Sequence, residues 1–234
     1  MFRYRRSVLA VEALSSYLLK ADDASFHDQV YDALAEALTE GVFAPGQSVS
    51  LRTLASGLNV SPMPVREAVR RLIAEKALEL QPSNKRLRVP SLSEDRLHQL
   101  AKARSWVEPE LAAIAAIKAT PELVDTLKEE DDTLMVALSK GDVEGYMKAN
   151  HAFHFHIYKA AHADLFYDMA RTLWLQTGPF MRVVFNKLGT VQLPRDHHQE
   201  LIGAFAARDA DTARTAMAED IAEGMDLMVE AVRV

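Results

Sequence analysis

The sequence predicts a mainly α-helical protein made of two domains. Apolar residues recur with helical spacing through most of the chain from residue 26 onward, and two short runs of strand character interrupt them within residues 78–89. A chain of 234 residues is longer than the usual single domain and fits two of ordinary size. Charge divides the chain as well, because residues 1–92 carry a formal charge of +2 and residues 93–234 carry −8, which together give −6. We therefore expect a domain boundary near residues 90–93.

Residues 50–80 are the most informative part of the first domain. A short helical pattern ends at a tight turn around residues 57–61, and a second helical pattern follows at once. Two short helices joined in this way form the frame of a helix-turn-helix, whose second helix lies in the DNA major groove. The apolar positions that define the patterns are Leu51, Leu54, Ala55 and Leu58 in the first helix and Val65, Ala68, Val69, Leu72 and Ile73 in the second.

The rest of residues 26–90 completes a winged form of this motif. A helix is expected from residue 26 to about residue 39, with Ser25 as its N-cap, and a Pro45-Gly46 turn follows it. Residues 78–81 and 86–89 have strand character and a polar, basic connection, so they predict a β-hairpin wing. Residues 1–25 form an N-terminal extension outside this winged domain.

Positive charge gathers on the predicted DNA-binding surface, although the whole chain is acidic. Residues 50–90 contain 8 basic and 3 acidic side chains, a local charge of +5. A phosphate backbone meets the local surface, so this regional charge matters more than the net charge. Arg66 and Arg70 lie one turn apart on the outward side of the second helix, with Arg71 beside them. A guanidinium there can bond a guanine or a phosphate through two N–H groups. The alternative is that these arginines only solvate a surface helix.

The residues around the turn carry a family resemblance. Leu-x-x-Leu-Ala at residues 51–55, followed by Val-Ser-x-x-Pro-Val-Arg-Glu-Ala-Val at residues 60–69 and a wing, resembles the winged helix-turn-helix of the GntR family of bacterial regulators. The helical remainder resembles the effector domain of the FadR subfamily, called FCD, so the likeness covers about residues 26–230. The resemblance implies that DNA is contacted by Arg52, Ser61, Met63, Pro64, Arg66, Arg70, Lys85 and Arg86.

Physical chemistry supports several of these roles. Ser61 is expected to cap the second helix, whose N-terminal N–H groups can meet a phosphate. Pro64 falls in the first turn, where its missing N–H costs nothing. The chain departs from the family at Pro62-Met63, where basic or polar residues are common, and at Asn84 in the wing, where glycine is common. Both departures concern the operator sequence rather than DNA binding itself.

From residue 93 to the C-terminus the chain shows only helical periodicity. The second domain, residues 93–234, is therefore expected to be an all-α bundle of six or seven helices. The resemblance implies that this FCD-like domain binds the effector and mediates dimerisation. Glycine, proline and capping residues place the expected helices at about residues 93–117, 121–139, 142–162, 164–178, 179–189, 195–207 and 209–232.

Histidines in the second domain point to a metal site. Asn150 and His154 lie four residues apart, on one face of a helix, and His198 lies near the start of a later helix. The FCD pattern has an Asp and a His at this spacing and then two later His residues. Its four positions correspond here to Asn150, His154, His198 and Asp220, so one carboxylate and two imidazoles are kept although two ligands are exchanged. Zn²⁺, Ni²⁺ or Mn²⁺ accepts this set and retains positions for water or a ligand carboxylate.

Two alternatives stay open for this pocket. Without a metal, His154 and His198 would hydrogen-bond the effector directly. By the resemblance, Arg104 matches an arginine that faces the ligand cavity, and a buried guanidinium needs an anion, which a small carboxylate effector would provide. Its alternative partners are Glu108, one turn further on, and Asp220. The other histidines of this region are expected to be surface or packing residues: His151, His156, His162 and His197.

Composition narrows the class of protein. The chain has no cysteine, which excludes disulfides and cysteine-based metal or catalytic sites. No segment approaches the roughly 20 uninterrupted apolar residues of a membrane span, and no small-residue cleavage pattern follows the N-terminal residues. We therefore expect a cytoplasmic protein without a membrane partner.

These observations predict a homodimeric, ligand-responsive transcriptional regulator. It would bind double-stranded operator DNA, repress a catabolic operon and respond to a small organic acid. Two rival hypotheses belong to other classes. The helical metal site could activate water in a metal-dependent hydrolytic enzyme, but no general base distinct from the ligands stands out. The DNA-binding module could instead answer to a protein partner, with the bundle serving only dimerisation.

Overall fold

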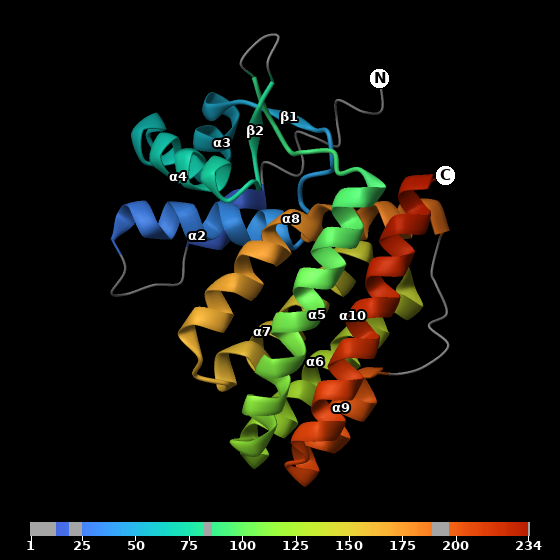
Figure 1. Ribbon diagram of the computed structural model, residues 1–234. Coiled ribbons are helices and arrows are strands. Elements are labelled where there is room, and N and C mark those ends of the chain that lie inside the picture. Colours follow the sequence, from blue (N-terminus) through green and yellow to red (C-terminus); the bar gives the residue numbers. More distant parts are fainter. Residues whose placement is uncertain (1–12, 19–24, 82–85, 189–196, 234) are drawn as a thin grey trace. The chain divides into compact units, whose positions relative to one another are not determined.

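The computed structural model describes residues 13–18, 25–81, 86–188 and 197–233. The chain forms two compact units (Figure 1). The first unit comprises residues 1–92 with residues 178–180, and the second comprises residues 93–177 and 181–234. The described residues are mainly helical with one small sheet, which confirms the predicted fold class. None of their helices has both the length and the apolar character needed to cross a membrane.

The first unit contains the two helices of the predicted helix-turn-helix. Its helical elements are the 3₁₀ helix η1 (Ala13–Leu18) and the α-helices α2 (Phe26–Thr39), α3 (Leu51–Leu58) and α4 (Pro62–Ala74) (Figure 1). Ser50 is the N-cap of α3, and its side chain accepts a hydrogen bond from the Thr53 N–H at 3.0 Å. Asn59 ends α3 in a left-handed conformation with φ of 55°, which asparagine tolerates better than most residues. The sharp turn into α4 follows from that conformation.

A three-stranded antiparallel sheet forms the wing. β2 (Glu79–Leu80) and β3 (Leu87–Arg88) are the hairpin that the sequence predicts, and β1 (Ser48–Val49) pairs with the other edge of β3. Val49 and Leu87 are direct partners across β1 and β3, and both side chains are buried. The sequence analysis did not predict β1, because a strand of two residues is too short to show alternation.

The core of the first unit lies between α2, α3 and α4. Leu34 and Leu38 of α2 are fully buried in it, and burial of a leucine contributes roughly 1.5–3 kcal/mol. The apolar positions that predicted the helix-turn-helix are buried at Leu54, Ala55, Leu58, Val65, Ala68, Val69 and Leu72. Because one side of α4 is fixed in this core, the opposite side must face solvent.

The second unit is an all-α bundle with six helices in the described residues, as predicted. They are α5 (Glu94–Ile117), α6 (Pro121–Lys140), α7 (Val143–Ala160), α8 (Asp164–Leu188), α9 (His197–Ala207) and α10 (Ala210–Arg233). α5 and α10 run side by side in opposite directions (Figure 1). Ion pairs join Glu94 to Arg233 at one end of this helix pair and Glu110 to Arg214 nearer the other.

The predicted helix break at Gly178-Pro179 is wrong. The sequence predicts helices over residues 164–178 and 179–189, whereas α8 continues through both residues as one helix. A proline inside a helix loses one hydrogen bond and crowds the preceding turn, at a cost of about 3 kcal/mol. Packing offsets this cost, since Trp174, Leu175 and Val184 of the same helix are buried. α5 likewise continues through Pro109.

Candidate functional site

The outer surface of α4 is basic and has little internal pairing. Met63, Arg66 and Arg70 face solvent, and 62% of Met63 is exposed. Arg66 forms no ion pair with any residue that the structure describes, while Arg70 pairs with Glu67 at 2.8 Å. Both partners of that pair are largely exposed, so it contributes at most about 1 kcal/mol and can be exchanged for a phosphate contact. The geometry of α4 therefore suits binding to a polyanion.

Arg71, in contrast, is bound to its own domain. Its guanidinium lies 2.8 Å from a carboxylate oxygen of Asp28 and 3.7 Å from the centre of the Tyr31 ring, both on α2. Tyr31 donates a hydrogen bond to Glu75, directly after α4. The hydrogen bonds of Ser25 and then Arg71 lower the pKa of Asp28. Arg71 thus holds α4 against α2 and is not part of the solvent-facing arginine pair.

The start of α4 differs from the expected cap. Ser61 occupies the N-cap position with an extended backbone, but its side chain makes no capping hydrogen bond. Pro64 stands at the third helical position and lacks the N–H that a capping serine would bond. Pro62 removes a further N–H, so a phosphate would meet fewer backbone donors than predicted. The exposed hydroxyl of Ser61 is the polar group that this helix end presents.

The remaining predicted DNA contacts lie on α3 and the wing. Arg52 is exposed in the first turn of α3, and Arg86 is exposed directly before β3. Lys85, at the predicted wing tip, lies outside the described residues. Arg88 of β3 donates a hydrogen bond from Nε to Glu79 of β2 at 2.8 Å, so this arginine stabilises the wing.

Three helices of the second unit bring His154, His198 and Asp220 together. His154 comes from α7, His198 from α9 and Asp220 from α10. The Nε2 atom of His154 lies 3.3 Å from one carboxylate oxygen of Asp220, and Nε2 of His198 lies 3.8 Å from the other. One ligand atom from each residue lies within 4.8 Å of the others. The structure thus unites three of the four predicted metal ligands, and we call them the His154 cluster.

Each histidine of the His154 cluster is held through its other ring nitrogen. Oδ1 of Asp131 lies 3.0 Å from Nδ1 of His198, and Oη of Tyr158 lies 3.2 Å from Nδ1 of His154. Tyr158 donates its own proton to Glu108, so its oxygen accepts one from His154. Both Nδ1 atoms therefore carry the proton, and both Nε2 atoms direct lone pairs toward the carboxylate of the cluster. Lone pairs from two imidazoles and a carboxylate fit a divalent cation.

The charges of the cluster favour the protonation states that bind metals. Burial by itself would raise the pKa of Asp220, but the hydrogen bond and charge that a protonated His154 supplies, followed by the charges of His198 and Arg104, lower it to about 2. Burial lowers the pKa of His154 by more than the neighbouring carboxylate raises it. The directions of the two pKa shifts favour an ionised Asp220 and a neutral His154, the forms that coordinate a metal.

Asn150, the fourth predicted ligand, belongs to a row of polar residues on α7. It is buried one turn before His154, on the same helical face. Tyr146 and Tyr158 continue this row at intervals of four residues, and both are buried. Contact between Asn150 and a metal stays a prediction.

A cavity of about 190 Å³ lies beside the turn between α6 and α7. Burial, followed by the negative charges of Asp220 and Asp131, raises the pKa of Tyr146 in its wall. Tyr146 stands one turn before Asn150 on α7, so this wall of the cavity belongs to the helix that carries His154. Its lining consists of Ala137, Leu138, Gly141, Asp142, Val143, Tyr146 and Phe185.

Arg104 has an internal anionic partner. Its Nε and Nη2 atoms donate to the two carboxylate oxygens of Glu108 at 2.6 and 2.9 Å, and its guanidinium lies 4.6 Å from the centre of a Trp174 ring. Glu108 has no exposed surface and also accepts hydrogen bonds from Tyr158 and from Trp174 Nε1. Of the partners that the sequence left open for Arg104, the structure shows Glu108, which neutralises the guanidinium. An additional contact with an effector stays a prediction.

Comparison with known proteins assigns the chain to a family. Residues 26–84 match the bacterial regulatory proteins of the gntR family, and residues 99–223, more than half of the chain, match the FCD domain. The chain belongs to the GntR family and carries an FCD domain. This regulator is 28% identical over 205 residues to the HTH-type transcriptional regulator McbR of Escherichia coli K12, covering 86% of this chain and 92% of McbR.

Other relatives of the regulator agree with this assignment. The solved structure of E. coli McbR/YncC superposes with a TM-score of 0.80 at 28% identity, covering 88% of this chain and 98% of that one. The HTH-type transcriptional repressor RspR of E. coli K12 is 21% identical, over 84% of this chain and 86% of RspR. The protein is thus a transcriptional regulator with a DNA-binding GntR domain and an effector-binding FCD domain. The matching families and relatives are regulators, not enzymes, while membership of the FadR subfamily stays a prediction.

The two side chains of the regulator that orient His154 and His198 were not predicted from its sequence. Asp131 stands in an acidic run, yet it falls in the helical row Val124, Leu127, Leu134, whose other members are apolar and buried. A carboxylate in such an apolar row needs a partner, so this pattern could have revealed it. Tyr158 could have been found by extending the row of Asn150 and His154 by one further turn.

Proposed function

We propose that this regulator is a homodimeric, cytoplasmic repressor of a catabolic operon whose operator affinity is lowered by a small carboxylate. The observation that carries the proposal is the His154 cluster, a metal-type ligand set buried in the same chain as an exposed, basic α4. The name of the relative RspR, a transcriptional repressor, supports the sign of regulation. The dimer is proposed by analogy with other helix-turn-helix regulators, whose two-fold dimers place two such domains on a palindromic operator.

DNA would be held by α4 and its neighbours. Arg66 and Arg70 would contact bases or phosphates in the major groove, with Ser61 and Met63 at the leading end of the helix. Met63 is apolar and exposed, which suits contact with a thymine methyl group. Arg52 would contact the backbone, and Lys85 and Arg86 of the wing would contact the backbone or the minor groove.

The effector would bind through a metal in the second unit. His154, His198 and Asp220 would hold Zn²⁺, Ni²⁺ or Mn²⁺, with Asn150 as a fourth ligand. The ion would offer its remaining positions to a carboxylate, while the cavity beside the turn between α6 and α7 would receive the rest of a small acid. The rival arrangement is a metal-free pocket in which His154 and His198 bond the acid directly.

A DNA-binding experiment with a metal arm tests this proposal. Labelled fragments of the regulator's own promoter region are titrated with the protein at fixed low salt, and small carboxylates are then added with and without a chelator. We expect a specific complex that a subset of acids weakens, and we expect the chelator to abolish that response. Failure to bind any promoter fragment would reject the repressor. An acid response that survives the chelator would instead support the metal-free pocket.

A further inference from the structure

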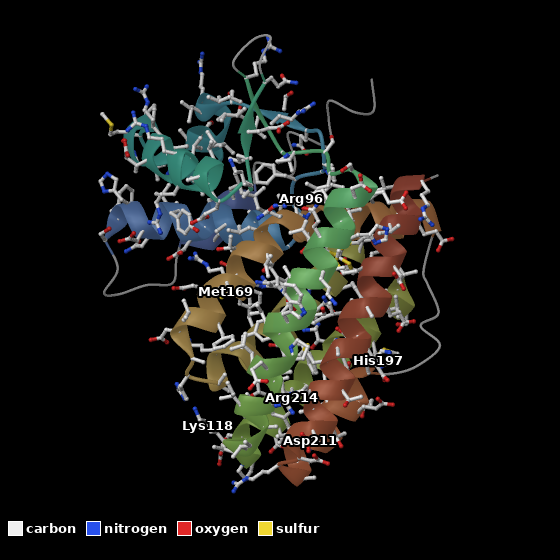
Figure 2. All side chains as sticks on the ribbon, in the orientation of Figure 1. Arg96, Lys118, Met169, His197, Asp211 and Arg214 are labelled. Carbon is white, nitrogen blue, oxygen red and sulfur yellow. The ribbon has the colours of Figure 1, made fainter. Side chains whose placement is uncertain are left out.

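A third histidine, next in sequence to His198 of the His154 cluster, has a buried ring nitrogen without a hydrogen-bond partner among the described residues. His197 is the first residue of α9, and its side chain is only 9% exposed. Its Nδ1 atom is buried and has no hydrogen-bond partner among the residues that the structure describes. Buried polar atoms are almost always paired, so an orphaned imidazole nitrogen calls for an explanation. Figure 2 shows His197 beside the C-terminal helices.

Carboxylates from two helices surround this imidazole. Oε2 of Glu200, on α9, and Oε2 of Glu219, on α10, each lie 3.8 Å from Nδ1 of His197. Oε2 of Glu223, one turn further along α10, lies 3.2 Å from Nε2 on the other side of the ring. One ligand atom each of His197, Glu200 and Glu219 lies within 4.8 Å of the others.

The contact with Glu223 determines what the ring presents to the other two carboxylates. A carboxylate near Nε2 favours the proton on that nitrogen, so Nδ1 presents its lone pair. A lone pair facing two carboxylate oxygens is repulsive unless a cation lies between them. Bonds of about 2.1 Å from an ion to nitrogen and to oxygen can span 3.8 Å at a wide angle, so little movement is needed.

We propose that His197, Glu200 and Glu219 form a second divalent-cation site, with Glu223 as the residue that orients the imidazole. One imidazole and two carboxylates suit Zn²⁺ or Mn²⁺ rather than Ca²⁺, which takes oxygen ligands alone. The two glutamates are partly exposed, which leaves room for water to complete the coordination. This inference does not depend on DNA binding or on the effector.

The second site shares no residue with the His154 cluster, but on both α9 and α10 its residues are sequence neighbours of the cluster's residues. His197 precedes His198 on α9, and Glu219 precedes Asp220 on α10. Consecutive residues on a helix point in different directions, so the two sites use different sides of the contact between α9 and α10. An ion at either site would tie the same two helices together, and binding at the two sites should therefore be cooperative.

Zinc stoichiometry of the full-length chain tests this proposal. Equilibrium dialysis against Zn²⁺, with elemental analysis, is applied to the wild type, to His197→Ala/Glu219→Gln, to His154→Ala and to the combination of all three substitutions. We expect two ions in the wild type, one in each partial variant and none in the combined variant. Glu230→Gln, an exposed charge change on the same helix, is the matched control and should bind as the wild type does.

The variants also separate this proposal from the metal site of the proposed function. If only the His197→Ala/Glu219→Gln variant loses an ion, the second site stands and the His154 site falls. If that variant retains the stoichiometry and affinity of the wild type, the second site is rejected. Glu200→Gln is a milder variant that should fold normally, because this side chain is one-third exposed. It should lower the affinity of the second site for Zn²⁺ at least about tenfold. Unchanged affinity of both ions in this variant would likewise reject the site.

Discussion

The charged side chains in the two functional regions of this regulator differ in burial and in pairing. On α4, Arg66 has no ionic partner among the described residues, and the partner of Arg70 is exposed. In the second unit, Arg104 and His154 are buried, and each forms a hydrogen bond with a side chain one turn further along its own helix. A surface that binds a polyanion benefits from cationic side chains whose internal partners are weak. Charged side chains that are buried must instead be paired for the domain to be stable. Substitutions should therefore act on binding in the first region and on both stability and binding in the second.

The largest effect is expected from Glu108→Ala. This substitution leaves the guanidinium of Arg104 buried and unpaired, and breaking such a pair costs about 3–5 kcal/mol. Urea unfolding followed by tryptophan fluorescence reports on the second unit, because Trp106 and Trp174 both lie there. The double variant Arg104→Met/Glu108→Leu should recover most of the loss. A single variant destabilised by less than about 1 kcal/mol would contradict the role given to this pair.

The next effect concerns DNA. Arg66→Ala should weaken binding to the promoter fragment by about 1–3 kcal/mol, because it removes a base or phosphate contact. Its unfolding free energy should change by no more than about 0.5 kcal/mol, since the side chain is exposed and has no ionic partner among the described residues. Arg71→Ala, on the side of α4 that faces α2, is the matched control and should lose stability, because Arg71 stacks on Tyr31. Equal DNA affinity of Arg66→Ala and the wild type at the same salt would refute the assignment.

A third effect tests the residues that orient the histidines. Asp131→Asn keeps the size of the side chain but weakens its hydrogen bond with Nδ1 of His198. Loss of such an outer partner lowers metal affinity by about 10–100-fold. Calorimetric titration with Zn²⁺ measures the change, and Asp132→Asn, at the exposed neighbouring position, should leave the affinity unaltered. If the two variants bind Zn²⁺ with the same affinity, Asp131 does not contribute to the metal site.

The smallest effect compares the starts of α3 and α4. Ser50→Ala removes a capping hydrogen bond and should destabilise α3 by roughly 1 kcal/mol. Ser61→Ala removes no such bond, so α4 should lose much less. Hydrogen–deuterium exchange of the peptides that cover each helix measures the two effects separately. Equal loss of protection in both helices would mean that Ser61 caps α4 after all.

Local patterns were sufficient to predict most of the fold. Within residues 51–73 the apolar residues recur with helical spacing. This spacing shows which side of α3 and which side of α4 is buried. The continuity of α8 through Pro179 could not be predicted, because buried neighbours override the local preference of proline. β1 could not be predicted either, since its two residues depend on pairing with β3, which lies far along the chain.

The same distinction holds for the site residues, because local patterns predict the exposed ones and tertiary packing decides the partners of the buried ones. Exposed residues such as Arg66 follow from helical periodicity alone, because no tertiary partner decides their direction. The position of Asp220 relative to His154 needed the family resemblance, since α7 and α10 are distant in sequence. The pairing of Arg104 was left between alternatives, because periodicity cannot rank an adjacent carboxylate against an external one. Glu108 proved to be the partner, and only packing determines this.

Coupling between the two regions is the central claim of this account, and one titration tests it most directly. The affinity of the full-length regulator for its promoter fragment is measured by fluorescence anisotropy, with Zn²⁺ present, against a panel of small mono- and dicarboxylates at millimolar concentration. The account predicts that at least one acid weakens the complex of the wild type and that His154→Ala binds the DNA but ignores that acid. A wild-type affinity that no acid changes, or an unchanged acid response in His154→Ala, would contradict it.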